Sequence, residues 1–177
     1  CTEPHAGPLT LSCFVSGHML GPDHWYRRAG EGTRICGNAS HWLDLVVHLL
    51  CWGTLPDRWS ITVTWSDSEV RDDNFAVCLA SERGDLANII LSARSEPFEG
   101  INESIDLQWG QVIAKIDDFR RMWIWKGTLK RSFRFSPKDV GHEAAIMQPF
   151  LPAAGRPWEE VILSSLLCLK VAEMVER

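Results

Sequence analysis

Residues 103–135 read ESIDLQWGQVIAKIDDFRRMWIWKGTLKRSFRF, and this stretch decides the expected fold. It is rich in β-branched and aromatic residues, which favour strands, and Gly110 and Gly127 mark two tight turns. Strands joined by tight turns pair antiparallel. The stretch therefore predicts four successive strands of an antiparallel sheet, at 103–109, 111–117, 122–126 and 129–135.

The strand pattern continues upstream of this stretch. From Pro8 to Gly17, apolar residues occupy every second position, as in a strand with one buried face. Further strands are expected at 59–66, 74–81 and 86–94. One large sheet accounts for all of these segments.

Helical spacing of apolar residues flanks the strand block. Asn38 and Ser40 are both plausible N-caps of a helix that continues to Leu50. Two more helices are expected at 138–150 and 158–176. Strands in one block with helices on either side of it in the sequence indicate an α+β fold, a large and mainly antiparallel sheet with helices on one face.

The number of tryptophans bears on the sheet face that the expected helices leave open. The chain has nine of them, more than a single helix-covered layer needs to bury. Several of them lie on the expected strands, among them Trp65, Trp109, Trp123 and Trp125. Because aromatic surface commonly marks association, we expect a homo-oligomer formed through the open sheet face. Ordinary core tryptophans are the alternative.

Length and composition set further bounds. The 177 residues fit one domain, 1–177, that is large enough for a packed core. A formal charge of −5 provides no basic field for nucleic acid, and no apolar stretch is long enough to cross a membrane. No signal peptide is recognisable, and six scattered cysteines without a CxxC pair indicate buried, reduced thiols rather than disulfides or zinc ligands. We therefore expect a cytoplasmic protein without a metal.

Polar side chains gather in residues 17–50, GHMLGPDHWYRRAGEGTRICGNASHWLDLVVHLL. The part up to Gly37 has no sustained period and is expected to be a long loop, and such loops are usually functional. The polar residues are His18, Asp23, His24, Arg34, Asn38, His41 and Asp44. An imidazole at a helix start can deprotonate a hydroxyl beside free backbone donors. The pattern indicates a general base, with helix capping or packing by His41 as the alternative.

The same run resembles a known enzyme family. It is similar to the second domain of the glucose–fructose oxidoreductase, inositol dehydrogenase and rhizopine catabolism (Gfo/Idh/MocA) family, in the branch with a DHW loop and a GGGR-x-x-GE-x-CH-x-x-D helix start. Downstream, SPKDVGHEAAIMQPF at 136–150 resembles the D-K-G-H segment of that branch. The two matches occur in the order of the family and together cover nearly the whole chain.

The resemblance implies a function and a set of residues. The chain would be the C-terminal substrate-binding domain of an oxidoreductase that acts on a sugar, nucleotide sugar or inositol-like polyol. NAD or NADP would be bound mainly by an N-terminal Rossmann domain, whose GxGxxG fingerprint and E-K-P lysine motif do not occur here. His41 would be the catalytic histidine. The substrate-binding residues would be Asp23, His24, Trp25, Arg34, Asn38, Asp44 and His142.

The sequence also departs from the family pattern. Gly37 stands where many members have Asp, and Asn38 stands where the branch has Glu. A second hypothesis is therefore a non-catalytic ligand-binding or oligomerisation module derived from that family. A third is an unrelated α+β protein that binds a small molecule and in which His41 caps a helix.

Overall fold

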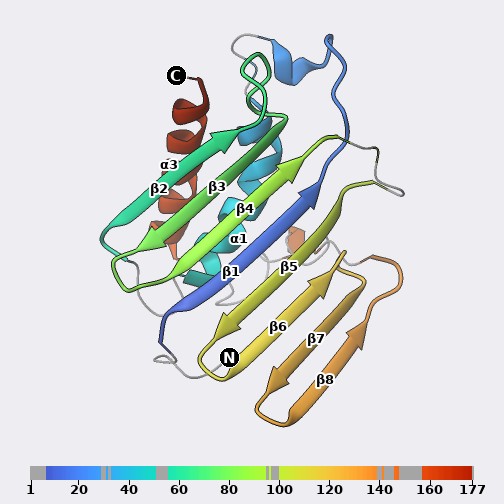
Figure 1. Cartoon of the computed structure of the whole chain (residues 1–177), viewed down its shortest axis with the longest axis vertical. Helices are drawn as coiled ribbons and strands as arrows, with labels where there is room; N and C mark the ends of the chain where they lie inside the picture. Colours follow the sequence, from blue (N-terminus) through green and yellow to red (C-terminus); the bar gives the residue numbers. More distant parts are fainter. Residues whose placement is uncertain are drawn as a thin grey trace.

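The computed structural model describes residues 7–28, 31, 33–50, 56–94, 96, 100–138, 141, 146–147 and 157–176. Its main element is an eight-stranded sheet with the order β2-β3-β4-β1-β5-β6-β7-β8 (Figure 1). The strands are β1 Leu9–Ser16, β2 Trp59–Trp65, β3 Asn74–Ser81, β4 Leu86–Ser92, β5 Asn102–Trp109, β6 Val112–Asp117, β7 Arg121–Lys126 and β8 Leu129–Arg134. All eight expected strands are present, so the α+β prediction is confirmed.

Neighbouring strands are antiparallel with one exception. β1 is the first strand in the sequence but lies in the middle of the sheet, where it pairs parallel with β4 and antiparallel with β5. Phe14, for example, is opposite Ile90 on one side and Ser104 on the other. The remaining pairs follow the chain from one hairpin to the next, as the tight turns predict.

Two helices cover one face of half the sheet. α1 (Ser40–Leu50) and α3 (Trp158–Glu176) lie together behind β2, β3, β4 and β1 in Figure 1, and β5 to β8 extend past them. Alternate β1 residues point towards the helices and are buried: Leu9, Leu11, Cys13 and Val15. They pack with apolar residues of both helices in one core. We call the opposite side of the sheet, which neither of these two helices covers, the open face.

The helix before the strand block begins earlier than expected. A π-helical turn, η2 (Ile35–Ala39), runs directly into α1. Asn38 lies inside this turn, and Ser40 has helical backbone angles, so neither residue is an N-cap. The first turn is held instead by Thr33 Oγ1, which accepts a hydrogen bond from the Cys36 N–H at 3.4 Å. The prediction of a cap at Asn38 or Ser40 was therefore wrong, because the local signal of Thr33 was overlooked.

Of the two helices that the sequence predicts after the strand block, the structure describes one in full and the other only in part. α3 has the expected bounds, 158–176, and buries one apolar stripe against α1 and the sheet. The helix expected at 138–150 falls largely outside the described residues; Lys138 is not helical, whereas 146–147 are. None of the helices in the described part of the chain is both long and apolar enough to span a bilayer.

The tryptophans on the strands divide between the two faces. The strand register places Trp65 and Trp109 on the helix side and Trp123 and Trp125 on the open face. The guanidinium of Arg121 lies 5.8 Å from the ring of Trp123, and the Lys130 ammonium lies 5.4 Å from the ring of Trp125. Cationic side chains thus lie close to both open-face rings.

The described cysteines are free thiols, but they are not all buried. Cys13 and Cys168 are buried, Cys36 is half-buried, and Cys78 is exposed on the open face. Cys1 and Cys51 lie outside the described residues. Burial, with a smaller effect of the Glu103 carboxylate, raises the pKa of the Cys13 thiol to about 12. The prediction of buried thiols was wrong for Cys78, because its strand has one uncovered face.

Candidate functional site

The chain leaves β1 in a loop that carries three aromatic rings. A short 3-10 turn, η1 (Trp25–Arg27), is capped by His24, whose Nδ1 accepts a hydrogen bond from the Tyr26 N–H at 3.2 Å. The ring of Tyr26 lies 4.0 Å from that of Trp25 and 4.8 Å from that of His24. Trp25 is 46% exposed. The turn therefore presents a compact aromatic surface to solvent.

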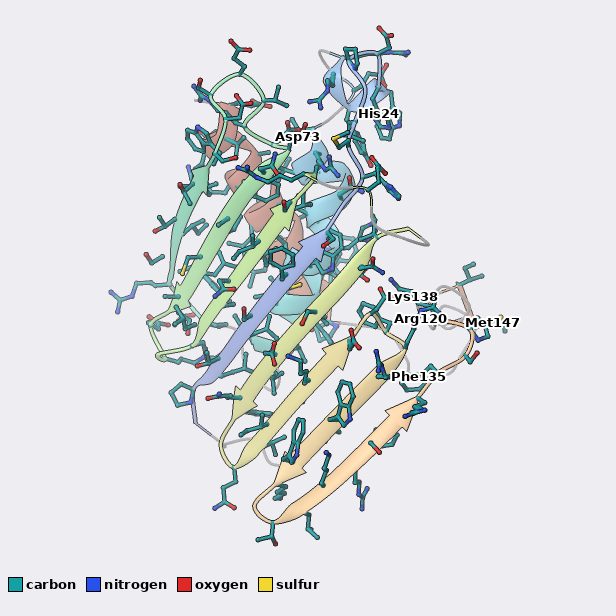
Figure 2. The ribbon with its side chains drawn as sticks, turned by 45° about the vertical axis from the view of Figure 1, so that its right-hand side comes forward. His24, Asp73, Arg120, Phe135, Lys138 and Met147 are labelled. Carbon is teal, nitrogen blue, oxygen red and sulfur yellow. The ribbon has the colours of Figure 1, made fainter. Side chains whose placement is uncertain are left out.

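Buried charges tie this loop to the start of the helix. Nη2 of Arg34 donates to the carbonyl oxygen of His18 at 2.6 Å, and Nη1 donates to Asp73 at 3.2 Å. Asp73 also accepts a hydrogen bond from Arg27 at 2.7 Å. A Cβ at Gly17 would lie 2.5 Å from Arg34 Nη2, so the close approach of the guanidinium requires glycine there. Figure 2 shows His24 and Asp73 at the same end of the molecule.

His41 lies on α1 directly after the π-helical turn. Such turns are rare and occur often at functional sites. His41 is exposed, and its imidazole meets the Trp42 ring edge-on, with 6.2 Å between the ring centroids. No hydrogen-bond partner of the imidazole is found among the described residues. A neutral imidazole in this state is free to accept a proton from a bound hydroxyl.

The loop and the helix meet where Tyr26 packs on Gly37. A Cβ at Gly37 would lie only 2.2 Å from Cε1 and Cζ of the tyrosine ring. This contact brings the segment with Asp23, His24 and Trp25 beside the segment with His41.

The remaining candidate site residues differ in burial and in their contacts. Asp23 is exposed and Asn38 is half-buried, whereas Asp44 is half-buried and already interacts within the protein. Arg34 is 1% exposed, and its recorded hydrogen bonds are all to protein groups. His142 lies outside the described residues.

Sequence reasoning missed the residues that hold the two segments together. Tyr26 and Gly37 were not selected, nor were Asp73 and Asp72, whose Oδ2 accepts a hydrogen bond from the Arg34 N–H at 2.9 Å. The tyrosine beside the DHW run was the one available signal. The two aspartates carry no local signal, because their partners lie almost forty residues away in the chain.

His41 is not a capping residue. The helix that contains it begins at η2, so its imidazole lies beyond the first turn rather than at the cap position. This finding contradicts the capping alternative. The described residues also contain no cluster of His, Cys, Asp and Glu that could hold a metal ion.

A second polar cluster lies near the turn between β6 and β7. Nζ of Lys138 donates to Asp118 at 2.6 Å and to Glu103 at 2.7 Å. Figure 2 shows Lys138 close to Arg120. Burial raises the pKa of Glu103, and the Asp118 charge adds to this effect, whereas the bond from Lys138 opposes it. Burial acts the same way on Asp118, but hydrogen bonds, led by that from Lys138, keep its pKa below the ordinary value.

This cluster borders a cavity of about 330 Å³ near the end of β1. Its lining includes Phe14, Ser16, Ser104 and Arg121. The register places these four side chains on the open face, whereas the helices lie on the other side of the sheet. The cavity is therefore separate from the site around His41.

Comparisons with known proteins rest on structure alone. No protein-family model matches the chain, and no curated protein matches its sequence significantly. An oxidoreductase from Thermotoga maritima matches 97% of this chain and 54% of its own, with a TM-score of 0.71 and 15% identity. The UDP-N-acetylglucosamine 3-dehydrogenase of Acidithiobacillus ferrooxidans matches 95% of this chain and 53% of its own, with a TM-score of 0.67 and 17% identity.

A third match names the family. A Gfo/Idh/MocA family oxidoreductase from Vibrio cholerae matches 97% of this chain and 55% of its own, with a TM-score of 0.58 and 19% identity. The chain thus spans about half the length of the solved structures that it matches. Its fold is that of an α+β domain of oxidoreductases. More narrowly, it is the fold of the C-terminal domain of the Gfo/Idh/MocA oxidoreductases.

Proposed function

We propose that this chain is the substrate-binding domain of an NAD(P)-dependent oxidoreductase that acts on a sugar, nucleotide sugar or inositol-like polyol. The observation that carries the proposal is His41. It combines an exposed imidazole, no hydrogen-bond partner among the described residues, and a position next to a π-helical turn and an aromatic loop. The fold shared with oxidoreductases supports this assignment but does not establish it.

In this proposal the loop binds the ligand and His41 handles the proton. The exposed face of Trp25 suits the apolar face of a sugar ring, and the Asp23 carboxylate can accept hydrogen bonds from ring hydroxyls. The His41 imidazole then accepts the proton of the hydroxyl that is oxidised. Arg34 acts from within the protein by fixing the loop rather than by touching the ligand.

The turn after β1 does not fit the pyrophosphate of a dinucleotide. The turn after β1 is the place where a strand leads towards a helix, yet Gly17 donates its N–H to the Ser92 carbonyl at 2.9 Å. The space beside its Cα is filled by the Arg34 guanidinium. A pyrophosphate cradle needs free backbone N–H groups and open space at such a turn. NAD or NADP is therefore proposed to bind to a Rossmann domain outside this chain.

The test is oxidation of a panel of sugars and polyols by the full natural polypeptide, followed by the absorbance of reduced nicotinamide. His41→Ala should lower kcat by about 10²- to 10⁴-fold, the usual contribution of a general base. His48→Gln is the matched control on the same helix, because glutamine can still donate to Glu160, which pairs with His48 at 2.7 Å. Equal kcat for His41→Ala and wild type would refute the role of His41.

A non-catalytic assembly module remains the second candidate, and the open face favours it. Four apolar side chains there are well exposed: Phe14 at 45%, Leu86 at 44%, Ile90 at 39% and Ile113 at 49%. Phe14 and Ile90 are neighbours on paired strands. We propose that a second copy of the chain covers this face, because contiguous exposed apolar surface commonly marks an interface.

Light scattering tests this interface. Phe14→Asp should halve the mass of the particle, because a buried unpaired carboxylate is costly. Leu129→Asp is the control, because Leu129 is 71% exposed on β8 and the register places it on the helix side. An assembly unaffected by Phe14→Asp would exclude the open face. Assembly and ligand binding without turnover in the full polypeptide would favour this second function over catalysis.

A further inference from the structure

The contact between Tyr26 and Gly37 involves the polar end of the tyrosine. A Cβ built on Gly37 would lie 2.3 Å from the phenol oxygen, as well as 2.2 Å from two ring carbons. Real Cβ atoms do not come this close to other atoms, so the phenol occupies space that only a glycine leaves open. On its other side, the ring lies against Trp25 and His24. The position of the hydroxyl is therefore determined from both sides.

The Tyr26 hydroxyl makes no hydrogen bond to another described residue. Within the described residues, no hydrogen bond to the Tyr26 oxygen is found, although Tyr26 is only half exposed. The buried side-chain nitrogen and oxygen atoms without a partner in the described part of the chain are Arg34 Nε and Trp59 Nε1. The Tyr26 oxygen, which also has no partner there, is therefore not buried but accessible to solvent. A tyrosine hydroxyl that is held near a helix start and makes no hydrogen bond within the protein can both donate a hydrogen bond to a ligand and accept one from it.

The Tyr26 phenol packs on Gly37, which precedes His41 on the same helix. Gly37 lies in the π-helical turn and His41 lies four residues later on α1, so the two positions are about one turn apart on the same side of the helix. Both groups are polar, accessible and without a hydrogen-bond partner among the described residues. A small molecule with several hydroxyl groups can reach both at once.

We propose that Tyr26 is a ligand-binding residue of the candidate site, which hydrogen-bonds a hydroxyl of a polyhydroxylated ligand beside His41, and that Gly37 is the residue that admits its phenol. The inference rests on the proposed function and adds a residue that the sequence analysis did not select. Tyr26 thereby sets which hydroxyl of the ligand faces the imidazole.

Calorimetric titration of the full chain with myo-inositol, D-glucose and UDP-N-acetylglucosamine tests this inference. Tyr26→Phe keeps the ring on Gly37 and removes only the hydroxyl, so it should weaken binding about 2- to 10-fold, the range for one neutral hydrogen bond, at an unchanged melting temperature. Gly37→Ala should weaken binding at least as much, because its methyl group displaces the phenol. Combining the two substitutions should cost no more than Gly37→Ala alone.

The outcomes separate this inference from the proposed function. Weaker binding by Tyr26→Phe, with no further loss in the double variant, supports it. If Tyr26→Phe binds every probe as tightly as wild type while His41→Ala binds more weakly, the role of Tyr26 is refuted and the proposed site stands. If wild type binds none of the three probes, both the proposed function and the role of Tyr26 are refuted.

Discussion

Arg34 and Asp73 are 39 residues apart in the chain, yet they form an ion pair at 3.2 Å in which the arginine side chain is 2% exposed. The same carboxylate binds Arg27 on the loop that leaves β1. Asp73 therefore connects three segments: the loop, the helix start and the beginning of β3. The geometry around His41 depends on a carboxylate that is not itself part of the candidate site.

The first prediction concerns this carboxylate. Asp73→Ala leaves the buried Arg34 guanidinium without its counter-charge, which should lower the free energy of unfolding by about 3 kcal/mol. Urea denaturation followed by fluorescence measures the loss. Asp106→Ala is the control, because its pair with Lys115 is exposed and should be worth less than about 1 kcal/mol. Equal stability of the two variants would contradict the structural role of Asp73.

The second prediction concerns Lys138, which lies between two carboxylates. Lys138→Met removes the cation that pairs with both Glu103 and Asp118 and leaves Arg120, 3.2 Å from Asp118, as its neighbouring charge, so the variant should lose about 2 to 4 kcal/mol at pH 7. The loss should shrink towards pH 4, because both carboxyl pKa values rise once the cation is gone and the groups protonate in the folded state. Urea titrations at the two pH values measure the difference. A loss independent of pH would argue against the cluster.

The third prediction concerns the hydrogen bonds that Asp85 accepts, which should stabilise the fold only while its carboxylate is ionised. This residue is 4% exposed, and it accepts hydrogen bonds from the Leu9 N–H at 2.9 Å and the Ser81 hydroxyl at 2.5 Å. Burial by itself would raise its pKa, but these bonds and Arg83 outweigh burial and hold the pKa below its ordinary value. A carboxyl group whose pKa is lower in the folded state than in the unfolded state stabilises the fold at any pH above the unfolded-state pKa. This stability is lost as the pH falls through the folded-state pKa.

Asp85→Asn should therefore cost about 1 to 3 kcal/mol at pH 7, and the difference from wild type should disappear in strong acid. Thermal unfolding from pH 7 down to pH 2 measures this convergence. If the stability curves of the variant and the wild type stay parallel down to pH 2, the charge of Asp85 does not contribute to stability.

The fourth prediction separates the thiols by reactivity. Alkylation requires the thiolate, so Cys13, with a pKa of about 12 in the core, should resist iodoacetamide at pH 8 until the protein unfolds. Cys78 is exposed on the open face and should be labelled in the native protein. Peptide mass spectrometry identifies the labelled site. Labelling of both cysteines at the same rate would contradict the assignment of faces in β1 and β3.

Much of the fold could be predicted because its signals are local. The alternation in β1 and the turn glycines 110 and 127 located strands to within about two residues, and the period of α3 predicted its bounds. An alternating strand shows which side chains share a face whatever its neighbours are. For the candidate site, the sequence identified the loop and His41 through motif spacing and resemblance.

Contacts between distant segments could not be predicted in this way. Nothing local indicates that β1 pairs parallel with β4, from which it is separated by some 76 positions in the register. The Asp73 bridge and the fit of Tyr26 against Gly37 likewise join segments that meet only in the fold.

By itself, the sequence determined where the strands and α3 lie, which face of β1 is apolar, and which loop carries the polar residues. Only the tertiary structure decided the strand order, the early π-helical start of the helix, the burial of Arg34 and the position of the Tyr26 hydroxyl. The physical reason is range: periodicity and turn chemistry act over a few residues, whereas buried ion pairs and close packing depend on partners that folding brings together.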